Sequence, residues 1–333
     1  MTPGHPGILL PEHRLALDCA RPGYDTLISH GHGDHVPWDP EEPVGTWKPS
    51  LAPTWCTPET GALIQARFTP RPHLTTVPYG EPFELNGCTV TFQSAGHILG
   101  SALIHIDTPK GSVLYTGDFK MGDSRTCASA QPMKGDVLVM ETTFGLPIFI
   151  WEPREALEER LVQFAQDTLA EGATPVYLAY ALGKGQEVVK ILGEHGVETS
   201  LHGAVQGMCD VYERFGCSFP LTSPYEKGTL AGKALVCPPS FRLNPMVTKL
   251  RDYRIAYVSG WASLENRRAQ MDADGLIPLS DHADFPGLLQ LVREVAPQQV
   301  FTVHGYTEPF SDYLRKQGVA AQPLTTTESR GEE

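Results

Sequence analysis

Ser29-His30-Gly31-His32-Gly33-Asp34-His35 is the stretch of this 333-residue sequence that decides its fold. It places three imidazoles and a carboxylate within six positions, directly after a segment, 25–29, that is typical of a short strand. Such side chains are costly to bury at a strand end unless something neutralises and orders them, and a metal ion does so. A solvated loop is the alternative. Because His-x-His-x-Asp-His offers two ligand pairs with different directions, it suits two adjacent ions.

Two further motifs supply what such a centre still lacks. Residues 95–101 place His97 between glycines after a predicted strand, and residues 114–118 place Asp118 at the end of another. Taken alone, a histidine in a turn is more often a hydrogen-bonding loop residue, and a strand-terminal aspartate more often caps the next turn. Together with the first motif they provide a third histidine for one ion and a carboxylate able to bridge two ions, as two-metal hydrolases require.

The secondary-structure pattern changes near residue 150. Short β-rich segments dominate before it, whereas Arg154–Ala170 has apolar residues at helical spacing and follows Pro153. Strands and helices then alternate, which predicts a parallel α/β unit. The predicted strands are 15–18, 25–29, 89–95, 102–107, 113–118, 137–142, 176–180, 234–237, 255–259, 276–279 and 300–304, and the predicted helices are 154–170, 186–194, 208–215, 285–295 and 309–317.

Composition excludes several classes of protein. With 26 basic and 39 acidic residues the net charge is -13, which argues against nucleic-acid binding through a broadly basic surface but not against a local site. Seven cysteines without a CxxC pair indicate neither a disulfide framework nor a cysteine zinc site. The longest nearly apolar run, 144–151, is too short to span a membrane, and residues 1–14 lack the features of a signal peptide. We therefore expect a soluble, cytoplasmic protein with no membrane partner.

The ordered set of the His-x-His-x-Asp-His motif, His97 and Asp118 resembles the signature of the metallo-β-lactamase fold superfamily. The resemblance implies an α/β fold, a four-layer αββα sandwich with the metals at one edge of its two sheets. It also implies that Asp18 supports the loop 29–35, called the metal loop below, without binding metal. By this resemblance one ion is held by His30, His32 and His97, and the other by Asp34 and His35, with Asp118 bridging them.

Three later motifs resemble those of the β-CASP nucleases, a branch of this superfamily: Met140–Gly145, Pro278–Asp284 and Thr302–Gly305. In that branch a mobile α/β domain is inserted between the first and second of these motifs. The resemblance therefore implies three segments: 1–150 as the first part of the metallo-β-lactamase domain, 151–274 as a small inserted β-CASP domain, and 275–333 as the C-terminal part of the metallo-β-lactamase domain. It also implies that His304 completes the second metal site and that Glu141 and His282 form a pair over the scissile phosphate.

Segments 280–289 and 303–310 look like the ligase-associated DNA exonucleases, small bacterial β-CASP proteins linked to DNA repair. This resemblance implies a metal-dependent phosphodiesterase that digests DNA from single strands or duplex ends, with a DNA ligase or helicase of the same pathway as partner. An RNA-processing β-CASP ribonuclease is the alternative. A small-molecule metallo-hydrolase is more distant, because it gives no role to Glu141 or His282. A catalytically inactive nucleic-acid-binding scaffold is a further alternative, although no ligand is missing.

The implied chemistry assigns catalytic roles to three residues. Two ions would lower the pKa of a bridging water, so that a metal-bound hydroxide attacks the phosphate, and Asp34 would help to hold that centre. His282 is the candidate general acid, kept charged and oriented by Glu141. A solvated strand-end carboxylate is the alternative for Glu141. Zinc is favoured as the metal because imidazoles dominate the ligand set, with manganese as the alternative.

Candidate substrate contacts come from three places. Ser280 lies in the second β-CASP-like motif, and Lys184 opens a predicted helix whose N–H groups could face a phosphate. Arg242 begins a segment, 242–268, with six basic and two acidic residues and interleaved aromatic residues, a pattern that could line a strand path. The alternatives are an ordinary Gly-rich helix start for Lys184 and a charged face with buried aromatic side chains for 242–268.

Overall fold

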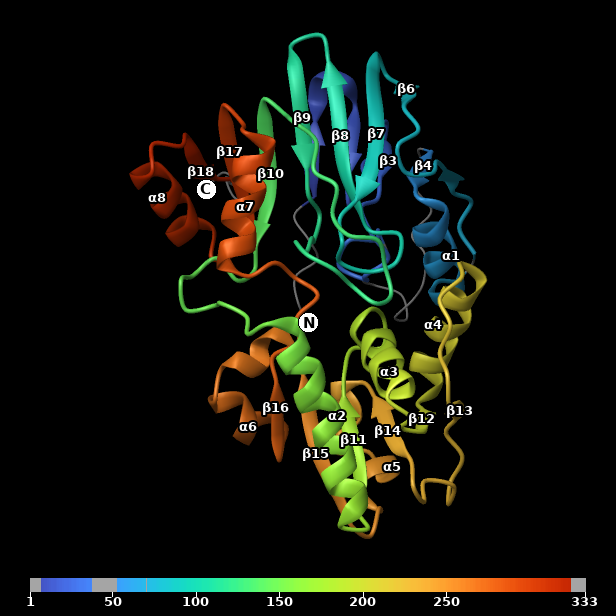
Figure 1. The fold of residues 1–333 in the computed structure, drawn as a ribbon. Coiled ribbons are helices and arrows are strands. Elements are labelled where there is room, and N and C mark those ends of the chain that lie inside the picture. The colour runs from blue at the N-terminus through green and yellow to red at the C-terminus, as the bar shows by residue number, and fades with distance from the viewer. Residues whose placement is uncertain (1–6, 38–52, 70, 325–333) are drawn as a thin grey trace, which may run out of the picture. The chain divides into compact units, whose positions relative to one another are not determined.

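The computed structural model describes residues 7–37, 53–69 and 71–324 (Figure 1). The chain divides into two compact units. Unit 1 comprises the described residues up to Asp123, residues 128–149 and those from His282 onward, and unit 2 comprises Ser124–Cys127 and Ile150–Asp281. Among the described residues no helix is both long and apolar enough to cross a membrane.

Unit 1 contains two sheets. The seven-stranded sheet has the order β18-β17-β10-β9-β8-β7-β6, and the five-stranded sheet has the order β1-β2-β3-β4-β5. The strands are β1 (Ile8–Leu10), β2 (Leu15–Leu17), β3 (Asp25–Leu27), β4 (Thr54–Cys56), β5 (Thr75–Thr76), β6 (Phe83–Leu85), β7 (Cys88–Ser94), β8 (Ala102–Thr108), β9 (Gly111–Tyr115), β10 (Val137–Thr142), β17 (Gln299–Gly305) and β18 (Ala321–Pro323). The helices are η1 (Pro11–His13), α1 (Pro58–Arg67), α7 (Phe285–Val295) and α8 (Thr307–Lys316).

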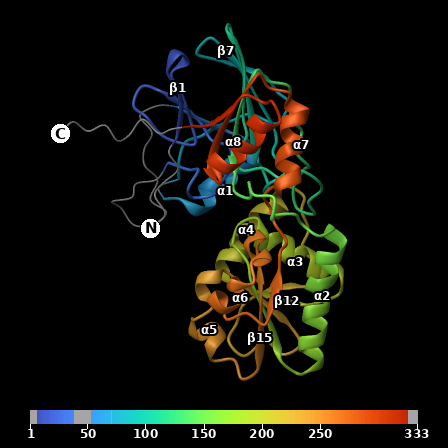
Figure 2. The ribbon, with the colours of Figure 1, turned by 90° about the vertical axis from the view of Figure 1, so that its left-hand side faces the viewer.

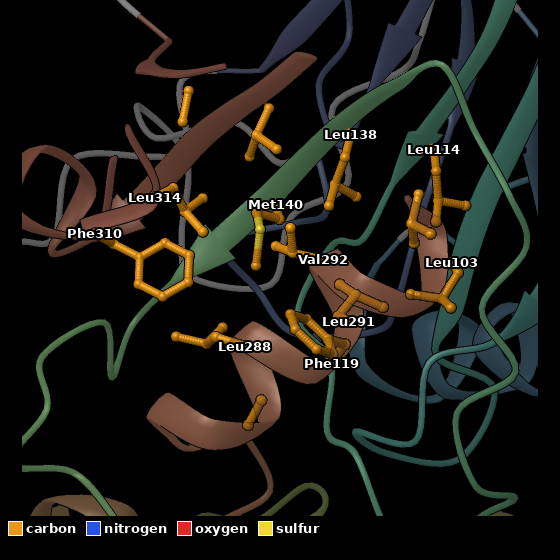
Figure 3. Close-up of a cluster of buried hydrophobic side chains, with 14 of the residues drawn as sticks. Leu103, Leu114, Phe119, Leu138, Met140, Leu288, Leu291, Val292, Phe310 and Leu314 are labelled. Atoms are coloured by element: carbon orange, nitrogen blue, oxygen red, sulfur yellow. The ribbon is translucent and has the colours of Figure 1, made fainter. Parts of the chain in front are cut away.

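Three buried clusters show how these elements are layered. Side chains such as Leu17 and Phe92 fill the space between the two sheets. The other face of the seven-stranded sheet is covered by α7 and α8 (Figure 3). Helix α1 packs through Ile64 onto the far side of the five-stranded sheet, against Cys56 of β4. The order helix, sheet, sheet, helix confirms the predicted four-layer αββα sandwich.

Helix α7 illustrates why the sequence folds in this way. Asp284 caps its start by accepting a hydrogen bond from Gly287 N, with proline in the first turn, and Ala296 ends it in the left-handed conformation. Leu288, Leu291, Val292 and Val295 follow the i, i+3, i+4, i+7 spacing and are buried. Figure 3 shows the labelled ones facing the side chains of β10.

Unit 2 is built on one six-stranded sheet of order β13-β12-β14-β11-β15-β16, in which every pair of neighbours is parallel. Figure 2 shows α2 on one side of this sheet and α5 and α6 on the other. The strands are β11 (Thr174–Leu178), β12 (Thr199–Leu201), β13 (Thr222–Pro224), β14 (Ala234–Cys237), β15 (Tyr253–Val258) and β16 (Gly275–Ile277). The helices are α2 (Arg154–Ala170), α3 (Lys184–Glu194), α4 (Gly203–Arg214), η2 (Pro239–Phe241), α5 (Pro245–Thr248), η3 (Gly260–Ser263) and α6 (Asn266–Met271).

In the sequence, the boundaries between the two units fall after Asp123, Cys127, Phe149 and Asp281. The segment 275–281 belongs to unit 2, because β16 pairs with β15 in parallel, with Leu276 opposite Tyr257, and completes the edge of that sheet. Residues 124–127 also belong to unit 2. Arg125 holds them there through two hydrogen bonds to Glu158 of α2.

Candidate metal centre and catalytic site

The candidate site lies at one edge of the seven-stranded sheet. Strands β9, β10 and β17 are parallel neighbours. Strand β7 runs in the same direction, because β8 is antiparallel to both β7 and β9. The carboxyl ends of these four strands therefore share an edge. The site residues at these ends are His97 after β7, Asp118 after β9, Glu141 in β10 and His304 in β17.

Four atoms that could bind a metal ion lie close together. Two of them belong to His30 and His32, in the loop after β3, and the other two belong to His97 and Asp118. His30 Nε2 and His97 Nε2 each lie 3.1 Å from His32 Nδ1. The same two nitrogens lie 3.6 and 3.8 Å from Asp118 Oδ2. A zinc ion with tetrahedral ligands at about 2.0–2.1 Å requires donor atoms about 3.3–3.4 Å apart. The spacing of these donors therefore fits a tetrahedral divalent ion.

A second, wider set of donors adjoins the first. His35 Nε2 lies 3.5 Å from Asp118 Oδ1 and 4.0 Å from Asp34 Oδ2. The ring of His304 is centred 5.7 Å from that of His35. The two oxygens of Asp118 thus face different histidines.

The metal loop is held from behind by Asp18. Its carboxylate accepts hydrogen bonds from Ser29 N and Ser29 Oγ, both at 2.6 Å, and from Tyr115 Oη at 2.7 Å. Asp18 Oδ2 also lies 2.8 Å from His35 Nδ1. A carboxylate on Nδ1 fixes the ring and leaves Nε2 for a metal, which is the usual outer contact of a histidine ligand. Asp18 thus forms hydrogen bonds with both Ser29, at the start of this loop, and His35.

The electrostatics of the cluster also suits metal binding. Burial, together with the neighbouring imidazoles, holds the pKa of His30 well below its usual value, so this side chain is neutral as a ligand must be. At His35 burial lowers the pKa, but Asp118 and Asp18 outweigh it and raise the pKa to about 9. Burial raises the pKa of Asp118 to about 7, against the effect of the nearby imidazoles. A divalent cation, if bound, would supply the positive charge that these groups otherwise take up as protons.

Local backbone geometry brings these side chains together. The pairing of β10 with β17 shifts register between Glu141 and Thr142, so that Thr142 pairs with Gly305 and His304 is the extra residue of a bulge. His304 has a φ of 54°, in the left-handed region that favours glycine. Gly117 has a φ of 52°, and a Cβ there would lie 2.4 Å from Ser29 Oγ. This glycine allows the turn before Asp118 to approach the metal loop.

Next to these candidate metal ligands, the side chains of His282 and Glu141 are joined by a hydrogen bond. His282 Nδ1 lies 2.9 Å from Glu141 Oε1, and His282 Nε2 lies 3.9 Å from Asp118 Oδ2. Glu141 is only 1% exposed, and it accepts hydrogen bonds from Phe119 N and Thr143 N. Burial by itself would raise its pKa, but the charge and hydrogen bond of His282, with the two backbone donors, lower the pKa to about 2. Glu141 therefore stays charged while it accepts a hydrogen bond from the imidazole.

The three candidate substrate contacts all lie in unit 2. Lys184 is buried at the first position of α3, and its Nζ lies 2.8 Å from Glu187 Oε2. Ser280 is buried just after β16, and Arg242 is partly exposed just after η2. Within the basic segment 242–268, Arg254 lies in β15 and pairs with Glu171. The substrate roles of Ser280, Lys184 and Arg242 stay predictions.

Sequence reasoning missed several residues that shape the site. Tyr115 and Ser29 lie inside the quoted motifs, and their hydroxyl groups were the available signal. Arg67, at the end of α1, donates a hydrogen bond to Gly31 O in the metal loop. Phe144 packs against His282, with ring centroids 6.0 Å apart. No sequence pattern pointed to Arg67, because its contact joins segments 36 residues apart.

Comparison with known proteins places this chain among metallo-hydrolases. The family model described as the Zn-dependent metallo-hydrolase RNA specificity domain matches residues 276–321. A protein named probable DNA ligase from Opitutus terrae is 33% identical over 317 residues, which cover 95% of this chain and 30% of that protein.

Other relatives match over shorter regions. The transcription termination factor FttA of Pyrococcus horikoshii is 35% identical over 39% of this chain and 21% of its own length. The endoribonuclease YSH1 of Kluyveromyces lactis is 35% identical over 37% of this chain and 16% of its own length. The chain thus spans less than a third of the length of these curated relatives.

A crystal structure of a protein of unknown function from Enterococcus faecalis matches the fold with a TM-score of 0.58. That match has 15% sequence identity and covers 92% of this chain and 80% of the other. At this level of identity the likeness concerns the fold alone.

Proposed function

The chain belongs to the β-CASP branch of the metallo-β-lactamase-fold family, and on that premise we propose that it is a metal-dependent DNA exonuclease acting on single strands or duplex ends in DNA repair. The observation that carries the proposal is the 2.9 Å contact between His282 and the buried Glu141, beside the imidazole and carboxylate cluster. A small-molecule metallo-hydrolase would need the cluster, but it would have no use for this second pair. Phosphodiester cleavage uses both.

We assign two divalent ions to the cluster, with zinc favoured by the imidazole-rich donors and manganese as the alternative. His30, His32, His97 and Asp118 would hold the first ion, and Asp34, His35 and His304, with Asp118, would hold the second. When bound, such ions would lower the pKa of the attacking water and offset the charge of the phosphate.

The proton on the leaving oxygen comes from His282 in this proposal. Because Nδ1 donates to Glu141 Oε1, the proton on Nε2 of the charged imidazole is the one available for donation. Glu141 favours the charged imidazole before the reaction, and its two backbone hydrogen bonds keep the carboxylate in place. A positioned general acid of this kind contributes roughly 10²–10⁴ in rate.

DNA is favoured over RNA by the extent of the likeness. The relative named probable DNA ligase aligns with 95% of this chain, whereas the relatives with RNA-related names align with less than 40%. An RNA-processing ribonuclease is the second candidate, because the matching family model is described as an RNA specificity domain. A DNA ligase or helicase of the same repair pathway is the proposed protein partner.

We assign the metallo-β-lactamase domain to unit 1 and the inserted β-CASP domain to unit 2. In this assignment unit 2 holds the nucleic acid through Ser280, Lys184 and Arg242. Lys184 would act through the backbone at the start of α3, because its side chain is buried against Glu187.

The decisive experiment is digestion of end-labelled DNA and RNA oligonucleotides of the same sequence with zinc, manganese or chelator. We expect nucleotide release from linear DNA, none with chelator, and none from a covalently closed circle. Faster digestion of RNA would replace the proposal by the ribonuclease, and nicking of the circle would make the enzyme an endonuclease. Hydrolysis of a thioester or lactam without activity on either nucleic acid would favour the small-molecule hydrolase.

A further inference from the structure

The turn that follows β10 presents an apolar side chain to solvent. Ile148 is 69% exposed, and the next residue, Phe149, is 1% exposed. Single exposed apolar residues are common on protein surfaces. Ile148 differs from such residues because the neighbouring Phe149 fixes its turn to unit 1, and because Phe149 contacts the aromatic ring that packs against His282.

Hydrogen bonds and aromatic contacts fix this turn to unit 1. Phe149 N donates to Leu146 O at 3.0 Å, and Phe149 O accepts from Phe285 N, at the start of α7, at 2.9 Å. The Phe149 ring lies 5.0 Å from that of Phe144 and 5.8 Å from that of Tyr306. Pro147 further restricts the chain just before Ile148. Ile148 therefore projects from a rigid base.

The same base borders the catalytic pair. Phe144 contacts both Phe149 and the ring of His282, at centroid distances of 5.0 and 6.0 Å. Two ring contacts thus separate the anchor of Ile148 from the candidate general acid. An apolar side chain on a fixed turn beside a nuclease centre has the features of the wedges that proteins insert between base pairs.

A hollow of about 470 Å³ adjoins the turn, within the ~300–1,000 Å³ of small-ligand pockets. Its lining includes Leu146, Pro147, Tyr313, Glu308 and Lys316. The apolar and aromatic groups suit the face of a nucleobase. A nucleotide unstacked by Ile148 would find a surface for its base there.

We propose that Ile148 is a strand-separating wedge that opens the terminal base pair of a duplex, so that one strand end can enter the site. The inference rests on the proposed nuclease function and adds to it the residue that would open a paired end. It predicts that Ile148 matters for duplex ends and not for strands that are already single.

The test compares Ile148→Ala with the wild type on a blunt duplex, on the same strand alone, and on a duplex with mismatched terminal pairs. We expect kcat/KM to fall about tenfold on the blunt duplex, a factor that corresponds to 1.4 kcal/mol, the mean stacking energy of one base-pair step. Rates on the other two substrates should not change. Ile148→Leu should restore the duplex rate, and Leu221→Ala, at a residue 49% exposed in unit 2, is the matched control.

A binding measurement separates failure of the wedge from failure of the nuclease. With 2-aminopurine in the terminal pair and His282→Asn to slow cleavage, protein binding should raise the fluorescence, and adding Ile148→Ala should abolish that rise. Equal effects of Ile148→Ala on paired and single ends, or an unchanged fluorescence rise, would overturn the wedge. An Ile148→Ala enzyme that digests every substrate normally would also overturn it and point to a protein contact at this turn.

Discussion

The two units bury titratable side chains in opposite ways. In unit 1 like donors face one another, since His30 Nε2 and His97 Nε2 each lie 3.1 Å from His32 Nδ1. In unit 2 opposite charges alternate. Glu158 accepts hydrogen bonds from Arg125 at 2.9 Å and from Arg154 at 2.6 Å.

The charged side chains of unit 2 neutralise one another, whereas the cluster in unit 1 requires an added positive charge. In unit 2 the chain neutralises its own buried charges, and Arg154 and Lys184 extend the pairing to Glu187 at 2.8 Å each. In unit 1 the imidazoles repel protons from one another, and the neighbouring carboxylates favour positive charge. Removing a charge should therefore cost metal and activity in unit 1, and folding stability in unit 2.

The largest effect is expected for Asp118→Asn. This carboxylate faces His30, His97 and His35, so its loss should weaken both proposed ions at once. We expect nucleotide release to fall more than ~10⁴-fold, beyond the contribution of a general acid alone, and the bound metal to decrease. Elemental analysis and a digestion assay measure the two losses. Asp107→Asn, at an exposed carboxylate of β8, is the control, and full metal content in Asp118→Asn would contradict the bridging role.

His282→Asn should have the next largest effect. Because His282 lies outside the proposed ligand sets, we expect a loss of about 10²–10⁴ in kcat with unchanged metal content. His202→Asn is a matched control, because His202 caps α4 in unit 2 and asparagine also caps helices well. A His282→Asn protein that loses metal would instead make His282 a ligand.

For unit 2 we expect a stability effect from Glu158→Gln. Glu158 is 5% exposed, and its loss leaves two guanidinium groups without their shared partner. We expect about 2–3 kcal/mol of destabilisation in urea unfolding, less than for a fully buried pair because the Arg125 side chain is 38% exposed. Metal content should not change. Glu152→Gln breaks an exposed pair with Arg160 and should cost at most about 1 kcal/mol.

The same pair of variants has a pH signature. Burial raises the pKa of Glu158, but hydrogen bonds and charge from Arg125 and Arg154 outweigh it and lower the pKa below the model-compound value of 4.5. A lowered pKa in the folded state stabilises the protein above pH 4.5, and this stabilisation is lost as pH falls below that value. Unfolding measured from pH 6 to 3 should therefore show a smaller acid-induced loss in Glu158→Gln than in Glu152→Gln. Parallel curves would contradict the assignment.

The helices and strands predicted correctly from the sequence are those whose signals lie within the element itself or in the residues next to it. The ends of β10, α2 and α7 match the predicted 137–142, 154–170 and 285–295, because spacing and proline signals mark these elements locally. Predicted strand 113–118 is shorter in the structure, where β9 ends at Tyr115 and the Gly117 turn carries Asp118 beyond it.

Features that depend on distant pairing could not be predicted. The bulge at His304 exists only in the register between β10 and β17. The place of β16 depends on β15, and that of residues 124–127 depends on Arg125 reaching Glu158. Helix α1 was missed, although Thr57 caps it and proline occupies its first turn, because the surrounding proline-rich sequence shows no clear period.

The smallest effect is expected for the more exposed ion pairs of unit 2, those of Glu194. Glu194 is about a third exposed and pairs with Arg125 Nη1 at 2.8 Å and with Lys190 at 3.2 Å. Because solvent screens these ion pairs, Glu194→Gln should lower the free energy of unfolding by only about 0.5–1 kcal/mol. This loss should become smaller as salt rises from about 0.05 to 1 M. The cost of Glu158→Gln should depend less on salt, since Glu158 is buried. Urea unfolding of both variants at the two salt concentrations measures this contrast. Equal salt dependence would mean that the burial of Glu158 does not shield its ion pairs from solvent.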